Sequence, residues 1–263
     1  MKKLHFEYRL SAFYTKPITE HRFLFRFLPT DTERQKLEDG NLFIANCHRY
    51  DMLTDRFGNR LVSGYIHMQH ARFDVSMCGS VITGIDIFEE KTSDPYAFRF
   101  YSLQSALTQP GPSLAELSRI VQLSEYPSDY EKAFCLTERL FGLLHYDPTL
   151  TKVGDSAEQA AGKGGGVCQD FAHIMLSLLR EQGVTARYAA GMLMGEGGSH
   201  AWVEVLCRGY WYGFDPTNRK LVNDEYIRVS CGRDAADCQV ISGTLNGEAV
   251  QKQEEWVVVR NFR

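Results

Sequence analysis

Residues 165–179 of the chain read GGVCQDFAHIMLSLL, and this stretch decides which fold the sequence can adopt. Its apolar residues cover a wide arc of a helix, which predicts a buried helix over residues 167–182. Gly183 follows and is expected to end that helix. Cys168 stands in the first helical turn, directly after a glycine-rich loop at residues 162–166.

The position of Cys168 favours a reactive thiol. The unpaired N–H groups and the positive dipole end of a helix N-terminus stabilise an anion, and the thiolate is the nucleophilic form of cysteine. Glycines in front of it let the backbone approach a substrate, and the N–H groups of Gly166 and Cys168 are candidate donors to an oxyanion. The alternative is a buried structural cysteine after a flexible loop. A phosphate loop is excluded, because Gly164 follows Lys163 where Ser or Thr is required.

A thiolate nucleophile needs a base and a group that orients the base. His173 and Asp170 lie about 140° and 200° around the helix from Cys168, so neither faces the thiol from within the helix. His200 is a better candidate, because it begins a predicted strand that leads through a tight hairpin to Asp215.

This hairpin has two registers that suit a catalytic pair. If residues 207–208 form the loop, His200 lies directly opposite Asp215. If residues 208–209 form it, Asp215 faces Trp202, one diagonal step from His200. Both registers put His200 and Asp215 on one face, with Cβ atoms about 5 Å apart when directly opposed and about 7–8 Å apart on the diagonal. A three-residue loop without a bulge would put them on opposite faces.

Three motifs together resemble the bacterial transglutaminase-like superfamily, whose members are often described as cysteine proteases. The motifs are GGVCQDFAH at residues 165–173, SHAWVE at residues 199–204 and FDPTN at residues 214–218. The resemblance implies that Cys168 is the nucleophile, His200 is the base and Asp215 orients the base.

The resemblance also implies the fold and the cofactor requirement. The expected fold class is α+β, with a papain-like transglutaminase core in which a buried helix packs against an antiparallel sheet, and no metal or organic cofactor. One departure from the family follows Asp237, where Cys238-Gln239-Val240 stands in place of proline-rich residues. This departure concerns the local loop and leaves the three motifs intact.

Gln169, Trp202 and Trp211 complete the set of candidate site residues. Gln169 follows the nucleophile and is a candidate cleft residue. Either tryptophan could shield the bond between His200 and Asp215 from water, and simple core packing is an equal alternative for both.

Residues 1–107 are predicted to form an antiparallel β-sandwich domain that precedes the core. Apolar and polar side chains alternate over residues 4–10 and 23–28, which is typical of strands with one buried face. Two prolines and a glycine at residues 108–113 mark a linker. The order of elements after it predicts a transglutaminase-like catalytic domain over residues 108–263.

The remaining elements follow from local patterns. Helices are expected from residue 114 and over residues 130–145, and Ser156 with Gln159 forms a weak capping box. Further strands are expected at residues 42–45, 65–77, 81–88, 97–101, 185–194, 200–206, 210–214, 226–229, 240–241 and 256–259.

Composition excludes several classes of protein. The 263 residues include 29 Lys and Arg against 33 Asp and Glu, and a net charge of −4 argues against a nucleic-acid partner. Seven scattered cysteines without a CxxC pair argue against a disulfide framework and a zinc knuckle. Because no apolar run approaches the ~18 residues that span a bilayer, we expect a cytoplasmic protein without a membrane partner.

The predicted function is a thiol-dependent amide hydrolase that acts on a peptide or protein through an acyl-enzyme. Two alternatives stay open: acyl transfer from a glutamine amide to an amine, as in a transglutaminase or deamidase, and a non-catalytic binding scaffold that retains the core. Arylamine N-acetyltransferases also use a Cys-His-Asp triad. Their cysteine comes much earlier in the chain, and Glu normally stands where this chain has Asp170. The sequence leaves open the substrate, the oligomeric state and a second oxyanion donor.

Overall fold

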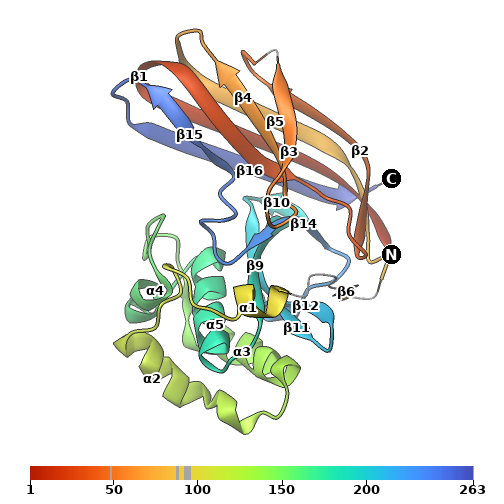
Figure 1. Ribbon diagram of the computed structural model, residues 1–263, viewed down its shortest axis with the longest axis vertical. Coiled ribbons are helices and arrows are strands. Elements are labelled where there is room, and N and C mark those ends of the chain that lie inside the picture. Colours follow the sequence, from red (N-terminus) through yellow and green to blue (C-terminus); the bar gives the residue numbers. More distant parts are fainter. Residues whose placement is uncertain (48, 87–88, 92–95, 263) are drawn as a thin grey trace.

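The computed structural model describes residues 1–47, 49–86, 89–91 and 96–262. They form a β-sandwich that sits over a second unit of helices and one further sheet (Figure 1). This arrangement is the expected α+β fold with an antiparallel sandwich in front of the core. No helix of the described residues is long and apolar enough to cross a membrane.

The sandwich is organised by one strand, β1 (Lys2–Leu28). The sequence predicted two separate strands, over residues 4–10 and 23–28, but the chain stays extended between them. The first half of β1 belongs to one layer and the second half to the other, with an irregular pairing in between. The two halves face each other across the core, where the rings of Tyr8 and Phe27 lie 4.1 Å apart. A single strand therefore takes part in both layers of the sandwich.

Seven other strands complete the sandwich. The first half of β1 pairs antiparallel with β5 and β16, and the second half pairs with β4 and β15. These strands and their neighbours are β2 (Gln35–Ile44), β3 (Tyr50–Thr54), β4 (Arg60–Ile66), β5 (His70–Thr83), β10 (Gly195–Gly197), β15 (Ile241–Asn246) and β16 (Gln251–Asn261).

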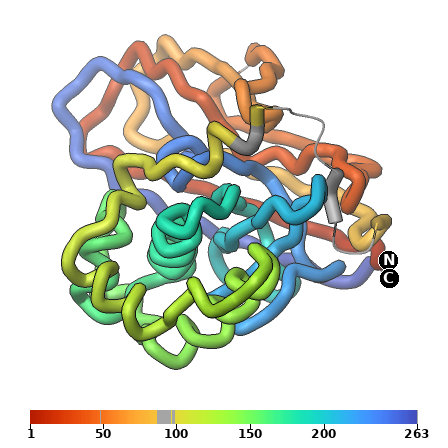
Figure 2. The backbone as a smooth tube through the Cα atoms, turned by 60° about the horizontal axis from the view of Figure 1, so that its bottom comes forward, coloured from red at the N-terminus to blue at the C-terminus, as the bar shows by residue number. Residues whose placement is uncertain are grey.

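The last two strands correct the predicted domain boundary. Residues 108–263 were expected to form the catalytic domain alone, yet β15 and β16 pair with β1 in the sandwich. Alternating side chains reveal a strand but not its partner, and the buried face of Val257 and Val259 packs in the sandwich core. As a result the two chain termini lie side by side (Figure 2), and Phe262 N donates to Lys3 O.

The second unit holds a sheet with the order β13-β12-β11-β9-β14, and β6 (Glu89–Lys91) pairs with β12. Its strands are β9 (Ala186–Leu193), β11 (His200–Cys207), β12 (Tyr210–Asp215), β13 (Lys220–Leu221) and β14 (Tyr226–Gly232). Its helices are α1 (Ala97–Tyr101), α2 (Pro112–Val121), η1 (Leu123–Glu125), α3 (Asp129–Leu143), α4 (Ala157–Lys163) and α5 (Cys168–Glu181).

Of the predictions made from local sequence patterns, some are confirmed and others are wrong. The capping box of Ser156 and Gln159 is confirmed at the start of α4. Residues 97–101 were predicted as a strand and form helix α1 instead, because tertiary contacts override their alternating pattern. The ring of Tyr101 packs against Trp211, and the backbone carbonyl of Tyr101 accepts a hydrogen bond from Arg180 Nε. Of the run predicted at residues 81–88, the first three residues extend β5, and residues 87–88 lie outside the described residues.

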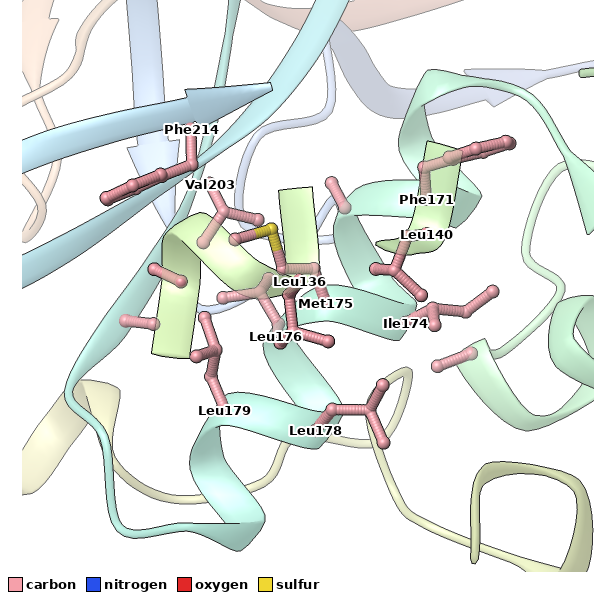
Figure 3. Close-up of a cluster of buried hydrophobic side chains, with 14 of the residues drawn as sticks. Leu136, Leu140, Phe171, Ile174, Met175, Leu176, Leu178, Leu179, Val203 and Phe214 are labelled. Atoms are coloured by element: carbon pink, nitrogen blue, oxygen red, sulfur yellow. The ribbon is translucent and has the colours of Figure 1, made fainter. Parts of the chain in front are cut away.

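Helix α5 is buried, as the sequence predicted. Figure 3 shows Met175 and Leu176 of this helix beside Leu136 of α3, with Val203 and Phe214 coming from the sheet. Because α5 is packed between α3 and the sheet, the first residue of α5 is held at a fixed place relative to β11 and β12.

Two side-chain amides tie the sandwich to the edge strand β14. Gln35 exchanges two hydrogen bonds with the backbone of Arg228, at 2.8 and 2.7 Å. Asn59 does the same with Cys231, at 2.8 Å for both bonds. Both amides are buried, and each satisfies one backbone N–H and one backbone C=O of β14.

Candidate active site

The start of α5 is fixed by the carboxylate of Asp170, which is buried. Its Oδ2 accepts from the backbone N of Val167 at 2.8 Å and from the hydroxyl of Thr151 at 2.6 Å. Burial raises the pKa of Asp170, and these two hydrogen bonds partly offset that shift. Asp170 therefore caps the helix that begins with Cys168 and does not contribute a second carboxylate to the cleft.

The two glycines before the cysteine are required by close backbone contacts. Gly165 and Gly166 form β8, which pairs in parallel with β7 (His145–Tyr146). A Cβ atom on Gly165 would lie 2.0 Å from His145 O. Gly166 has a φ of 150°, and its Cβ would meet the carboxylate of Asp170. Gly166 was a candidate oxyanion donor, but it is not among the residues that line the cleft.

The backbone N–H groups of Cys168 and Gln169 are better placed for an oxyanion. The N–H groups of Asp170 and Phe171 both donate to Val167 O, so they are not available to bind an oxyanion. The first two residues of a helix have no acceptor within that helix. Cys168 and Gln169 occupy these positions, and both line the cleft.

The hairpin of β11 and β12 adopts the second of the two expected registers. Cys207 pairs with Tyr210, so residues 208–209 form the loop. Arg208 and Gly209 have φ angles of 53° and 87°, as a tight two-residue hairpin turn requires. His200 Nε2 consequently lies 2.7 Å from Asp215 Oδ2.

Asp215 is fully buried and is satisfied by several donors. Its Oδ1 accepts from the backbone N of Thr217 and of Asn218 in the turn that follows β12. Its Oδ2 accepts from Asn218 Nδ2 at 2.7 Å and from the Tyr226 hydroxyl at 2.8 Å. Burial disfavours the carboxylate, but these bonds and His200 lower the pKa of Asp215 overall.

Asn218 and Tyr226 were not predicted. Asn218 lies three residues after Asp215 in a turn sequence, so its amide could have been proposed from spacing alone. Tyr226 comes from β14, which pairs with β9 at the far edge of the sheet, and nothing local in the sequence indicates its contact with Asp215.

The Cys168 thiol lines the same cleft and lies close enough to His200 to raise the pKa of the imidazole. Since Nε2 is bound to Asp215, Nδ1 is the ring atom left for the thiol. Burial lowers the pKa of His200, but hydrogen bonds to Asp215 and Cys168 and the negative charge of both groups raise it to about 10. The imidazolium form is therefore favoured near neutral pH.

A cleft of about 640 Å³ opens between the two units at this point. Cys168, Gln169 and His200 line it from the α+β unit. The sandwich contributes Phe27, Ile241, Gln253 and Glu255. Cys238, Gln239 and Val240, where the sequence departs from the family pattern, line the cleft as well. The sandwich therefore forms one wall of the cleft.

The two candidate tryptophans lie in different places. Trp202 is buried, stacks with His200 at a ring distance of 6.4 Å and donates to Glu204 Oε1. Trp211 packs in a separate cluster with Tyr101 and Leu206, away from the triad residues. Only Trp202 can cover the His200 side chain.

Glu204 anchors this side of the site. It is fully buried and forms ion pairs with Arg187, Arg228 and Arg34, the last of which comes from the sandwich. Burial opposes ionisation, but the three guanidinium groups hold the pKa of Glu204 well below its usual range. Glu204 therefore fixes Trp202 against His200 and joins the two units.

Comparisons with known proteins agree with this architecture. The family model of the transglutaminase-like superfamily matches residues 118–216, and that of the bacterial transglutaminase-like N-terminal region matches residues 4–82. A solved structure from Cytophaga hutchinsonii, described as a "putative cysteine protease", superposes with a TM-score of 0.82 at 21% identity. That superposition covers 100% of this chain and 91% of the other.

Curated relatives match over a shorter stretch. An uncharacterized protein of Mycobacterium leprae is 40% identical over 114 residues, which are 40% of this chain and 40% of the relative. An uncharacterized protein of Mycobacterium bovis is 32% identical over 126 residues, 42% of this chain and 40% of the relative. The matches therefore span less than half the length of these relatives. With both regions matched in chain order, the chain belongs to the transglutaminase-like superfamily and carries the N-terminal region of its bacterial members.

Proposed function

We propose that the chain is a thiol-dependent amide hydrolase in which Cys168, His200 and Asp215 form a catalytic triad. The observation that carries the proposal is the orientation of His200. The Nε2 atom of its ring is bound to the buried Asp215 at 2.7 Å, and the ring lies close to Cys168, which lines the same open cleft. Such an arrangement suits nucleophilic catalysis, in which a base is held by a carboxylate next to a thiol.

The chemistry would follow the usual two-step course of acyl transfer. The Cys168 thiolate attacks the amide carbonyl carbon, and the N–H groups of Cys168 and Gln169 donate to the oxyanion. The His200 imidazolium gives its proton to the leaving amine as the C–N bond breaks, which leaves a thioester on Cys168. Water then loses a proton to His200 and attacks the thioester, which releases the acid and restores the Cys168 thiolate and the His200 imidazolium.

A panel of unlabelled peptides tests this proposal. New peptide termini identified by mass spectrometry, present with the wild type and absent with Cys168→Ala, are the expected result. Cys135→Ala is a matched control, because Cys135 is a buried thiol on α3, outside the cleft lining. Turnover that survives Cys168→Ala would refute the assignment of the nucleophile.

The same acyl-enzyme could react with an amine instead of water. Adding a dansylated amine and a glutamine-rich protein to the assay distinguishes the two outcomes. Hydrolysis predicts cleaved peptide without dansyl incorporation, and amine incorporation would replace the hydrolase proposal with a transglutaminase.

A further inference from the structure

A carboxylate of the sandwich binds the residue that directly precedes His200. Glu255 on β16 accepts from the backbone N and the hydroxyl of Ser199 through Oε2, at 3.2 and 2.8 Å. Ser199 is the residue before His200 in the chain. Glu255 also lines the cleft, so its charge is part of the site although it lies 40 residues after Asp215 in the sequence.

The charge of Glu255 has no counter-ion among the described residues. Its Oε1 is buried and lacks a hydrogen-bond partner of normal geometry. The nearby hydroxyl of Tyr8 is uncharged, and burial together with the charge of Glu255 raises the pKa of Tyr8 further. A carboxylate held in such surroundings is weakly screened, so its field extends into the adjoining space more strongly than that of an exposed carboxylate.

The other groups at the cleft do not balance this charge. None of the described residues that line it is Lys or Arg. The His200 imidazolium is already matched by the carboxylate of Asp215, 2.7 Å from its Nε2. The remaining lining is apolar or neutral, including Phe27, Tyr188 and Ile241. Glu255 thus leaves the cleft with a net negative field.

We propose that Glu255 is a specificity-determining residue that selects substrates with a positively charged group. The substrate class is a peptide segment or amine that carries an ammonium or guanidinium group near the amide bond. This inference rests on the proposed function, because it names the substrate class of the same cleft. Anionic segments are disfavoured, since they would meet an unbalanced carboxylate without a cation to bind them.

Two thiol reagents of similar size and opposite charge test the proposal without a known substrate. They are the trimethylammonium-ethyl and the sulfonato-ethyl methanethiosulfonates. The Cys168 thiolate attacks the reagent sulfur, a disulfide forms and methanesulfinate leaves. The second-order rate at Cys168 is followed by mass spectrometry of the peptide that contains it. We expect the cationic reagent to react faster at low salt, with the ratio falling towards one as salt rises.

Two variants separate charge from structure. Glu255→Gln keeps an oxygen acceptor for Ser199 but removes the charge, so the cation-to-anion rate ratio should fall by roughly fivefold. Ser199→Ala removes a hydrogen bond but keeps the charge, so the ratio should stay at the wild-type value. An unchanged ratio in Glu255→Gln overturns the proposal.

The same measurement keeps this inference distinct from the proposed function. If Glu255→Gln does not fold, a wild-type ratio of one at low salt still overturns the charge selection. The absolute rate at Cys168, compared with partly buried Cys47 and Cys78, tests the reactive thiol instead. A large ratio with an ordinary absolute rate would support Glu255 and contradict the triad.

Discussion

Tyr226 and His200 bind the same oxygen of Asp215, with Tyr226 Oη at 2.8 Å and His200 Nε2 at 2.7 Å from Oδ2. Tyr226 is buried and belongs to β14, whereas His200 belongs to β11. The hydroxyl therefore fixes the direction in which the carboxylate presents itself to the imidazole. A residue that no sequence motif includes helps to orient the proposed base.

Removing this hydroxyl should weaken the orientation of His200 without abolishing the triad. We expect Tyr226→Phe to lower kcat by about tenfold, and Asp215→Asn by about 10²- to 10⁴-fold, because the amide can present its N–H group to the ring and reverse the tautomer. Steady-state kinetics on any peptide found to be cleaved measures both. Tyr210→Phe, at the start of β12, is the control and should leave kcat unchanged. Equal losses in Tyr226→Phe and Tyr210→Phe would contradict the orienting role.

The ion pair between His200 and Asp215 should stabilise the folded protein near neutral pH and lose this effect as the pH becomes alkaline. The folded pKa of His200 is raised to about 10 from a model-peptide value of 6.5. A raised histidine pKa stabilises the folded state fully below pH 6.5, and that contribution disappears as pH rises towards 10. The difference in unfolding free energy between wild type and His200→Gln should therefore shrink over this range. Urea denaturation at pH 6, 8 and 10 measures it, and a difference that grows with pH would contradict the ion pair.

Helix α5 should be the main source of stability in the α+β unit. Phe171 is 2% exposed, and Phe171→Ala is expected to cost about 3–5 kcal/mol of unfolding free energy. Phe134 on α3 is 45% exposed, so Phe134→Ala should cost much less. Cys168→Ala should fold normally, because Cys168 sits at the edge of this core. Similar costs for the two phenylalanines would contradict the burial of α5.

The contact between the units should depend on Gln35. Gln35→Ala removes both hydrogen bonds between this amide and the backbone of Arg228, which should cost about 1–3 kcal/mol. Gln251→Ala, at an exposed position of β16, is the matched control. Thermal and chemical denaturation compare them. If both variants have the unfolding free energy of the wild type, Gln35 does not stabilise the contact between the two units.

Local patterns in the sequence predicted the parts of the fold that depend on neighbouring residues. The apolar arc of α5 and the hairpin of β11 and β12 are examples, because periodicity and a two-residue loop fix their geometry. Both two-residue registers of the hairpin predicted His200 and Asp215 on one face, and one of these registers forms, rather than the three-residue loop that would have separated them.

Contacts between distant segments could not be predicted in the same way. The continuity of β1 and the return of β16 to the sandwich depend on pairing over more than 200 residues, for which alternation gives no partner. The helix at residues 97–101 reverses a local strand pattern through contacts with Trp211 and Arg180. Tyr226 and Glu255 reach the site from such segments, so the sequence motifs did not include them.

The most direct test of the proposed triad is acylation by p-nitrophenyl acetate, quenched in acid and followed by peptide mass spectrometry. The account predicts that an acetyl group appears on Cys168 well before it appears on Cys47, Cys78 or Cys207, which are also partly buried free thiols. Acetylation of Cys168 should slow strongly in His200→Gln. Equal, slow acetylation of all four cysteines, unchanged in His200→Gln, would contradict the account.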